Sequence, residues 1–140
     1  MSIKKFFSKI FSLDNFSFSK IKIKKKVIES IIAFARASHP KEFSAFLQGS
    51  IKNKILIIDD LIYQPYRASE TATFTRIDPY LSKVFGSVHS HTLHCLEPSQ
   101  TDLLFFNKKG AIHLIVCYPY TVKDIACYDF KGRKIEFEIA

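Results

Sequence analysis

Residues 88–102 read VHSHTLHCLEPSQTD, and this segment holds the most informative pattern in the chain. His89 and His91 lie two residues apart, and side chains at that spacing on a strand point to the same side of the sheet. Both imidazoles can therefore face one metal ion, while Ser90 points to the opposite side. Asp102 follows Ser99 by three residues, at the predicted start of a helix, where its carboxylate can approach the same ion.

Each part of this pattern also has a purely structural explanation. A serine followed three residues later by an acid, as in Ser99 and Asp102, is typical of a helix cap. A pair of histidines on a strand is common without a metal. Together, however, two imidazoles and one carboxylate leave the fourth position of a tetrahedral zinc ion open, as in catalytic zinc sites. Zinc lowers the pKa of a bound water from about 15.7 to about 7. Helix capping by Ser99 is compatible with metal binding, because the cap holds Asp102 in place.

The elements around this segment follow from hydrophobic periodicity. Alternation with lysines predicts a strand at Ile21 and Ile23, and a helical stripe predicts a helix over about 26–38 that ends at His39-Pro40. The other predictions are a strand over 55–63, a loop over 64–78, a helical turn over 80–85, a helix from Ser99 through Phe106 that ends at 108–110, a strand over 111–118, and a closing hairpin of 125–130 with 134–139.

This order of elements predicts an α/β fold of the α+β type, with helices packed on one mixed sheet. The chain has 140 residues, of which 47% are hydrophobic, and no apolar run approaches the roughly 18 residues that span a bilayer. A chain of this size suits one compact domain. We place that domain at residues 25–140, after a basic amphipathic segment at residues 1–24.

The net charge of +8 is concentrated in the N-terminal segment. Residues 1–26 hold eight lysines and one acid, which gives +7, whereas the remaining residues hold 13 basic and 12 acidic side chains, which gives +1. A nucleic-acid groove needs positive charge on the folded body. Nucleic acid is therefore an unlikely partner.

The apolar residues of the N-terminal segment recur at helical spacing between lysines and serines. This amphipathic pattern indicates a helix that packs on the domain or on a second copy; contact of residues 1–19 with a membrane surface is the less favoured alternative. The three cysteines, Cys95, Cys117 and Cys127, are scattered and odd in number, so we expect a reduced, cytoplasmic compartment.

With the glutamate of His39-Pro40-Lys41-Glu42-Phe43, the motif His89-Ser-His91-x7-Ser99-x-x-Asp102 resembles the JAMM/MPN zinc metallopeptidases. The surrounding segments resemble the family too, over roughly residues 25–140. The resemblance implies a curved mixed β-sheet flanked by helices, a cytidine deaminase-like architecture. One further motif residue departs from the pattern, since Thr92 stands where the family often has proline, which leaves the shape of the following loop open.

The resemblance also implies the roles of the motif residues. His89, His91 and Asp102 would bind one Zn²⁺ per chain. Glu42 would take a proton from the zinc-bound water that attacks the substrate and deliver it to the leaving amine. Ser99 would stabilise the oxyanion of the tetrahedral intermediate.

The family cleaves amide or isopeptide bonds at the C-terminus of ubiquitin or ubiquitin-like proteins. Because this chain is too short for the insertions that grip polyubiquitin, the expected substrate is a small ubiquitin-like modifier or sulfur-carrier protein. Two alternatives remain: a non-catalytic scaffolding domain that binds a protein partner, and a zinc hydrolase that trims an amino-acid adduct from a sulfur carrier. The sequence does not predict an oligomeric state.

Other polar residues have weaker claims to function. His94 and Cys95 lie in the loop of the motif and could form a second metal site with His91, although an ordinary solvated loop is the simpler interpretation. His113 lies in an apolar strand and is predicted to be a core histidine with satisfied hydrogen bonds. Cys117 and Cys127 are predicted to be small buried residues.

Overall fold

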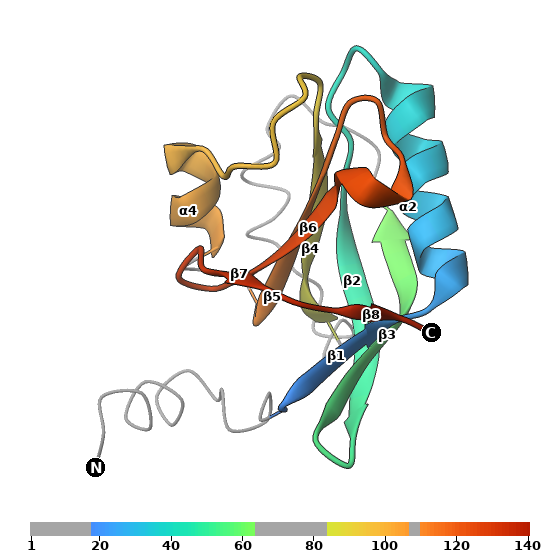
Figure 1. Ribbon diagram of the computed structural model, residues 1–140, viewed down its shortest axis with the longest axis vertical. Coiled ribbons are helices and arrows are strands. Elements are labelled where there is room, and N and C mark those ends of the chain that lie inside the picture. Colours follow the sequence, from blue (N-terminus) through green and yellow to red (C-terminus); the bar gives the residue numbers. More distant parts are fainter. Residues whose placement is uncertain (1–17, 64–83, 107–109) are drawn as a thin grey trace.

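The computed structural model describes residues 18–63, 84–106 and 110–140 (Figure 1). One mixed sheet of eight strands, in the order β7-β6-β5-β4-β2-β3-β1-β8, forms the centre of the fold. Its strands are β1 (Lys20–Ile23), β2 (Ser44–Lys52), β3 (Ile55–Tyr63), β4 (Val84–His91), β5 (Ile112–Cys117), β6 (Ile125–Asp129), β7 (Lys134–Ile135) and β8 (Glu138–Ile139). The helices are α2 (Lys25–Ser38), α4 (Gln100–Phe106) and the 3-10 helix η3 (Val122–Asp124).

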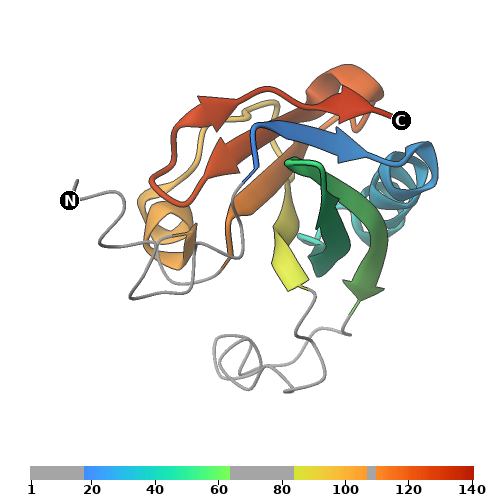
Figure 2. The same ribbon diagram turned by 90° about the horizontal axis from the view of Figure 1, so that it is seen from below.

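The sheet is curved and lies between the two α-helices, with α2 on one side and α4 on the other (Figures 1 and 2). Strand β4 pairs with β5 in parallel and with β2 in antiparallel orientation, so β4 lies in the interior of the sheet. The predicted α+β class, with a curved mixed sheet flanked by helices, is confirmed.

Strand β5 separates the two packing layers. All six of its residues are buried, which agrees with the prediction of a central strand from its unbroken apolar run. Leu114 and Val116 belong to the core that the buried stripe of α2 covers. Ile115 points the other way and packs with Phe106 of α4 and with Tyr128 of β6. Strand alternation therefore gives one layer to each helix.

Several predicted elements match the structure closely. The lysine-flanked strand is β1, the helix over 26–38 is α2, and the strand over 55–63 is β3. Strand β2 runs through Gly49 to Lys52, and its pairing register with β3 shifts between Gln48 and Gly49. A Cβ at Gly49 would collide with the carbonyl oxygen of Ile57, so this glycine permits a close strand approach.

The predicted hairpin at the end of the chain is only partly correct. Lys134–Ile135 pairs with β6, as predicted, but Glu138–Ile139 crosses to the other edge of the sheet and pairs in parallel with β1. Phe137 packs against the main core between these two short strands. Backbone bonds from Ala140 N–H to the Ile23 carbonyl and from Lys25 N–H to the Ala140 carbonyl fix the crossing. The partial burial of Phe137 against the core and these long-range bonds outweigh the local hairpin pattern.

The remaining predictions concern segments at the limits of the described chain. Val84 and Phe85 belong to β4 and not to a helical turn, because they continue the strand that carries the histidines. Strand β1 lies within the segment 1–24, so residues 20–23 are part of the sheet. The amphipathic helix predicted near the N-terminus, the loop predicted at 64–78 and residues 108–109 of the predicted helix end lie outside the described residues. In the part that is described, no helix has the length and apolarity that crossing a bilayer would require.

Candidate metal centre

The two histidines of the motif lie at the carboxyl end of β4. His89 pairs with Ile115 and His91 with Cys117 of the parallel neighbour β5. The imidazole of His89 is 6.2 Å from the Phe106 ring, centroid to centroid, which places it on the α4 side of the sheet. Ser90 points to the other side, where its buried Oγ accepts a hydrogen bond of 2.7 Å from the Phe43 N–H. The strand geometry expected for the motif is confirmed.

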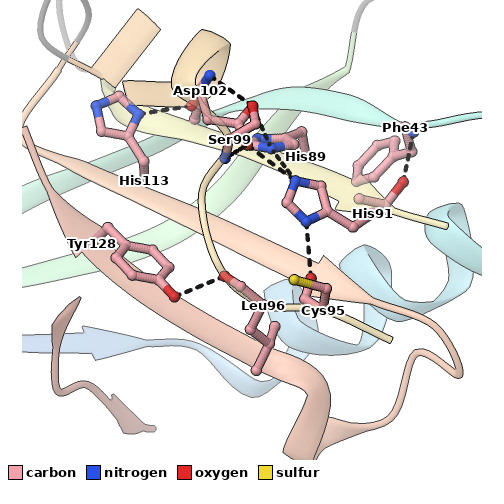
Figure 3. A network of polar contacts seen from close by, with 11 residues as sticks. Phe43, His89, His91, Cys95, Leu96, Ser99, Asp102, His113 and Tyr128 are labelled. Carbon is pink, nitrogen blue, oxygen red and sulfur yellow. Dashed lines mark hydrogen bonds and ion pairs between the residues drawn. The ribbon is translucent and has the colours of Figure 1, made fainter. Parts of the chain in front are cut away.

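Asp102 is held at the start of α4 by reciprocal bonds with Ser99 (Figure 3). The Asp102 N–H donates to Ser99 Oγ at 3.0 Å, and the Ser99 N–H donates to Asp102 Oδ2 at 2.8 Å. This is a capping box in which the acid is an aspartate. The same contacts that cap the short helix therefore fix the orientation of the carboxylate toward β4.

Three possible ligand side chains meet between β4 and α4 (Figure 3). The distances are 3.1 Å from His89 Nε2 to His91 Nε2, 3.1 Å from His89 Nε2 to Asp102 Oδ1, and 3.1 Å from His91 Nε2 to Asp102 Oδ2. Each side chain is 16% exposed. Zinc bonds of roughly 2.0–2.2 Å in a tetrahedron place the donor atoms about 3.4 Å apart, so a zinc ion would need only a slight expansion of this group.

The protonation state of His91 supports a cation at this point. Its Nδ1 lies 2.9 Å from the Cys95 carbonyl oxygen, which can only accept, so Nδ1 carries a proton. In the neutral imidazole Nε2 then has a lone pair, and that lone pair faces Asp102 Oδ2. Two acceptors at 3.1 Å repel each other unless a proton or a metal ion lies between them. A carbonyl partner for the distal nitrogen is also the usual environment of a metal-binding histidine.

Electrostatics in the group favour a charged carboxylate. Burial alone would raise the pKa of Asp102, but hydrogen bonds with His89 and His91 outweigh it and hold this pKa far below its usual value. The hydrogen bond with Asp102 raises the pKa of His91, which burial partly opposes. Without a metal, the raised pKa extends the protonated state of the His91 imidazole to higher pH than usual, and a divalent cation would replace that proton.

Glu42 lies just before β2, next to the end of β4. Ser44 pairs with His89, and the Ser90 N–H donates to the Phe43 carbonyl at 2.8 Å, so the antiparallel register brings Glu42 beside His91. Side chains two residues apart on an extended chain point to the same side, so Glu42 and Ser44 lie on the same face. The Glu42 side chain is exposed, and its charge contributes to the raised pKa of His91. Glu42 therefore lies near the group of His89, His91 and Asp102 but is not one of its three converging side chains.

His113 is a buried neighbour of this centre. Its ring stacks on Phe106 at 4.3 Å, and its Nδ1 lies 2.8 Å from Ser87 Oγ. The prediction of a core histidine is correct in its burial, but Nε2 has no hydrogen-bond partner among the described residues. Burial lowers the pKa of His113 to about 3, so the ring is neutral at physiological pH.

The loop between His91 and Ser99 does not form the second metal site with His91 that the sequence left open as an alternative. His94 and Cys95 are exposed, as expected of a solvated loop, and neither side chain joins His91 in a ligand group. His94 instead lies near Cys117 and Asp124. Sequence analysis did not single out Asp124, although Thr121-x-x-Asp124 is a second capping-box pattern. Cys117 and Cys127 are buried, as predicted.

Comparisons of the sequence with known proteins agree on one family. Residues 24–130 match the family of prokaryotic homologs of the JAB domain. A probable metalloprotease of Haloferax volcanii is 27% identical over 114 residues, which cover 73% of this chain and 68% of that protein.

Solved structures agree with this family. A JAB1/MPN domain protein from Archaeoglobus fulgidus is 37% identical, with a TM-score of 0.69, over 85% of this chain and 98% of that one. A structure described as a JAMM metalloprotease-like zinc site in the proteasome and signalosome is 35% identical, with a TM-score of 0.68, over 87% and 99%. A Desulfitobacterium hafniense protein is 18% identical with a TM-score of 0.59, covering 86% of this chain and 91% of that one, and shows the fold alone.

Proposed function

Since the chain belongs to the family of prokaryotic homologs of the JAB domain, we propose that it is a zinc-dependent peptidase that cleaves amide or isopeptide bonds at the C-terminus of a ubiquitin-like modifier or sulfur-carrier protein. The observation that carries this proposal is the convergence of His89, His91 and Asp102, each pair of donor atoms being 3.1 Å apart. Three protein ligands of this kind leave a coordination position for substrate or water.

In this function, His89 Nε2, His91 Nε2 and the Asp102 carboxylate hold one zinc ion. The bound metal supplies a Lewis acid that polarises the scissile carbonyl and makes water a nucleophile near neutral pH. The chain itself fixes the ligands: β4 sets the two imidazoles, and the Ser99 capping box sets the carboxylate. Preorganisation of this kind avoids a cost of ordering the ligands at the moment of binding.

Glu42 acts as the general base and then as the general acid. Its place beside His91 in the β2–β4 register, outside the ligand triangle, suits a carboxylate that moves a proton without occupying the metal. It accepts a proton from the attacking water and delivers it to the nitrogen of the leaving amine. Its exposure leaves its carboxylate accessible to a substrate amide.

Ser99 donates to the oxyanion of the tetrahedral intermediate. Its Oγ accepts the Asp102 N–H, so the hydroxyl proton of Ser99 is not used in that bond. The residue is exposed and is fixed by its own N–H bond to Asp102 Oδ2. A fixed hydroxyl next to the ligands can therefore donate where negative charge develops.

The exposed side chains of Glu42 and Ser99 favour a substrate that approaches from outside, such as the flexible tail of a small protein. Family membership supports the same substrate class. The two chemically distinct forms are a lysine-linked conjugate, whose isopeptide bond would be cleaved, and a carrier with an amino acid attached to its C-terminus, which would be trimmed.

The test is to assay the zinc-loaded protein against a ubiquitin-like protein joined to a lysine side chain and, in parallel, against a carrier–amino-acid adduct. If one of these substrates is cleaved, and cleavage stops on chelation and returns with added zinc, the result supports a zinc peptidase. It also shows which of the two substrate forms the protein cleaves. Activity that survives complete zinc removal contradicts the mechanism. Zinc-loaded, folded protein that cleaves neither substrate but binds the carrier favours the scaffolding alternative.

A further inference from the structure

A second group of possible ligands lies at the end of β5, next to the first. It consists of His94 on the loop after β4, Cys117 at the last position of β5, and Asp124 at the end of η3. His94 Nδ1 is 4.0 Å from Cys117 Sγ and 3.9 Å from Asp124 Oδ1, and all three ligand atoms lie within 4.8 Å of one another. We propose that His94, Cys117 and Asp124 form a second metal site, selective for a thiophilic divalent cation such as Zn²⁺.

The carboxylate of this group is oriented before any metal binds. Asp124 Oδ2 accepts bonds from the Thr121 N–H at 2.9 Å and from the Thr121 hydroxyl at 2.8 Å. These bonds close a capping box on η3 and leave the other oxygen, Oδ1, directed toward His94. Asp124 is 7% exposed, so the position of Oδ1 is set by packing as well as by hydrogen bonds.

The thiol of Cys117 is buried beside that carboxylate, being 1% exposed. Burial and then the charge of Asp124 raise the pKa of the thiol, so Cys117 is neutral when no cation is present. A divalent cation between the two residues would stabilise a thiolate and a carboxylate together, since a bound metal is the largest charge in such a site. Binding therefore replaces the thiol proton, which leaves to solvent, with a metal–sulfur bond.

The donor set indicates the kind of metal. One sulfur, one imidazole nitrogen and one carboxylate oxygen suit zinc, whereas magnesium and calcium prefer oxygen ligands throughout. With zinc–ligand bonds of about 2.0–2.3 Å, donor atoms lie about 3.4–3.6 Å apart. The two His94 distances, 4.0 and 3.9 Å, must therefore contract by about half an ångström, and water would complete the coordination.

His94 is the residue that must move. Its side chain is 74% exposed on a loop, whereas Cys117 and Asp124 are fixed in the core. At present its Nδ1 lies 2.8 Å from the Tyr118 carbonyl oxygen, to which it donates in the neutral tautomer. Metal binding would exchange this hydrogen bond for coordination. The alternative is that no metal binds here and that His94 only donates to the Tyr118 carbonyl and pairs weakly with Asp124. The test below distinguishes this alternative from a metal site.

Cobalt substitution separates the two groups, because a cobalt–thiolate bond gives a near-ultraviolet charge-transfer band and the first group contains no sulfur. We expect this band in the wild type and in His89→Ala when each is titrated with Co²⁺. We expect it to disappear in Cys117→Ser. In His94→Ala, whose exposed site tolerates the change, the band should need at least about 100-fold more cobalt, since loss of even an outer-shell partner costs 10–100-fold.

Cys95→Ser is the matched control, because Cys95 is an exposed cysteine on the same loop and lies outside the three-residue group. It should keep the band. Absence of the band in folded wild type at saturating cobalt overturns the proposal. So does a band that persists in Cys117→Ser, or one that is lost in Cys95→Ser, because the thiolate would then come from another residue. If Cys117→Ser does not fold, an unchanged cobalt titration of His94→Ala is sufficient to refute the site.

Discussion

The two ligand groups at the ends of β4 and β5 hold their carboxylates in the same way but differ in their imidazoles. Asp102 is fixed by a capping box with Ser99, and Asp124 by a capping box with Thr121. In the first group both imidazoles project from one strand, and the donor atoms already lie 3.1 Å apart. In the second, the imidazole is on an exposed loop and its distances to the other ligands are 3.9 and 4.0 Å.

This difference shows which ligands of a metal site can be positioned by residues close together in the sequence. A capping box positions an acid within four residues of chain, and a strand positions two histidines within three. The second group joins residues 23 and 30 positions from His94, and it forms only because β4 and β5 pair in parallel, which brings their carboxyl ends together. The first group is therefore nearly complete before metal binds, whereas the second needs movement of its loop.

The largest predicted effect is on turnover in the first group. Glu42→Gln should lower kcat by about 10²–10⁴-fold, the usual contribution of a general base, while zinc content stays unchanged because Glu42 is not a ligand. The measurement is turnover of the cleaved substrate together with elemental analysis. Glu29→Gln, the same chemical change on the exposed surface of α2, is the control and should behave as wild type. Equal turnover in Glu42→Gln and wild type would remove Glu42 from the mechanism.

The next effect is on metal content. His89→Ala should weaken zinc binding at the first group by at least about 100-fold and leave the second group loaded. In the wild type, ordering His94 costs about 0.5–1.5 kcal/mol, so the second group should bind zinc about two- to tenfold more weakly from this cause alone. A stepwise chelator titration measures the order of release. Earlier release from the first group would show that donor spacing does not control affinity here.

The pH dependence of zinc binding should also differ between the groups. Below the raised pKa of His91, each pH unit of acidification should weaken the first group by about tenfold per proton displaced, so the loss begins above pH 6.5. Above that pKa the affinity should level off. The pKa of Cys117 is raised from 9.0, so zinc affinity at the second group should keep rising beyond pH 9. Zinc competition assays across pH, in wild type and His89→Ala, measure both curves; parallel curves would contradict the assignment of a thiol to one group only.

The smallest effect concerns the two capping boxes. Ser99→Ala and Thr121→Ala should each lower the free energy of unfolding by about 0.5–2 kcal/mol, the cost of losing an N-cap side chain. Urea unfolding of the metal-free proteins measures it. Ser99→Ala should also slow turnover, because Ser99 has a second role at the oxyanion, whereas Thr121→Ala should not. Equal turnover in the two variants would restrict Ser99 to capping.

The sequence was sufficient for the first group because its pattern is local. The i, i+2 spacing of His89 and His91 and the three-residue step from Ser99 to Asp102 each depend on one element only. The fold class followed from the same kind of periodicity. The second group could not be predicted, since nothing near Cys117 indicates that His94 and Asp124 surround it. The prediction for residues 138–139 was wrong for a related reason: the alternation of residues 134–139 is compatible with a hairpin, and only long-range contacts of Phe137 and Ala140 direct β8 to β1.

The path of residues 134–139 has a consequence for biosynthesis. This short stretch supplies both edge strands of the sheet, and Ile139 pairs with Ile23 near the other end of the described chain (Figure 2). While the polypeptide emerges from a ribosome, β1 cannot gain its β8 partner, nor β6 its β7 partner, until residues 134–139 have left the exit tunnel. The two edges of the sheet therefore form later than the pairs between β2, β3, β4 and β5, whose residues all emerge earlier.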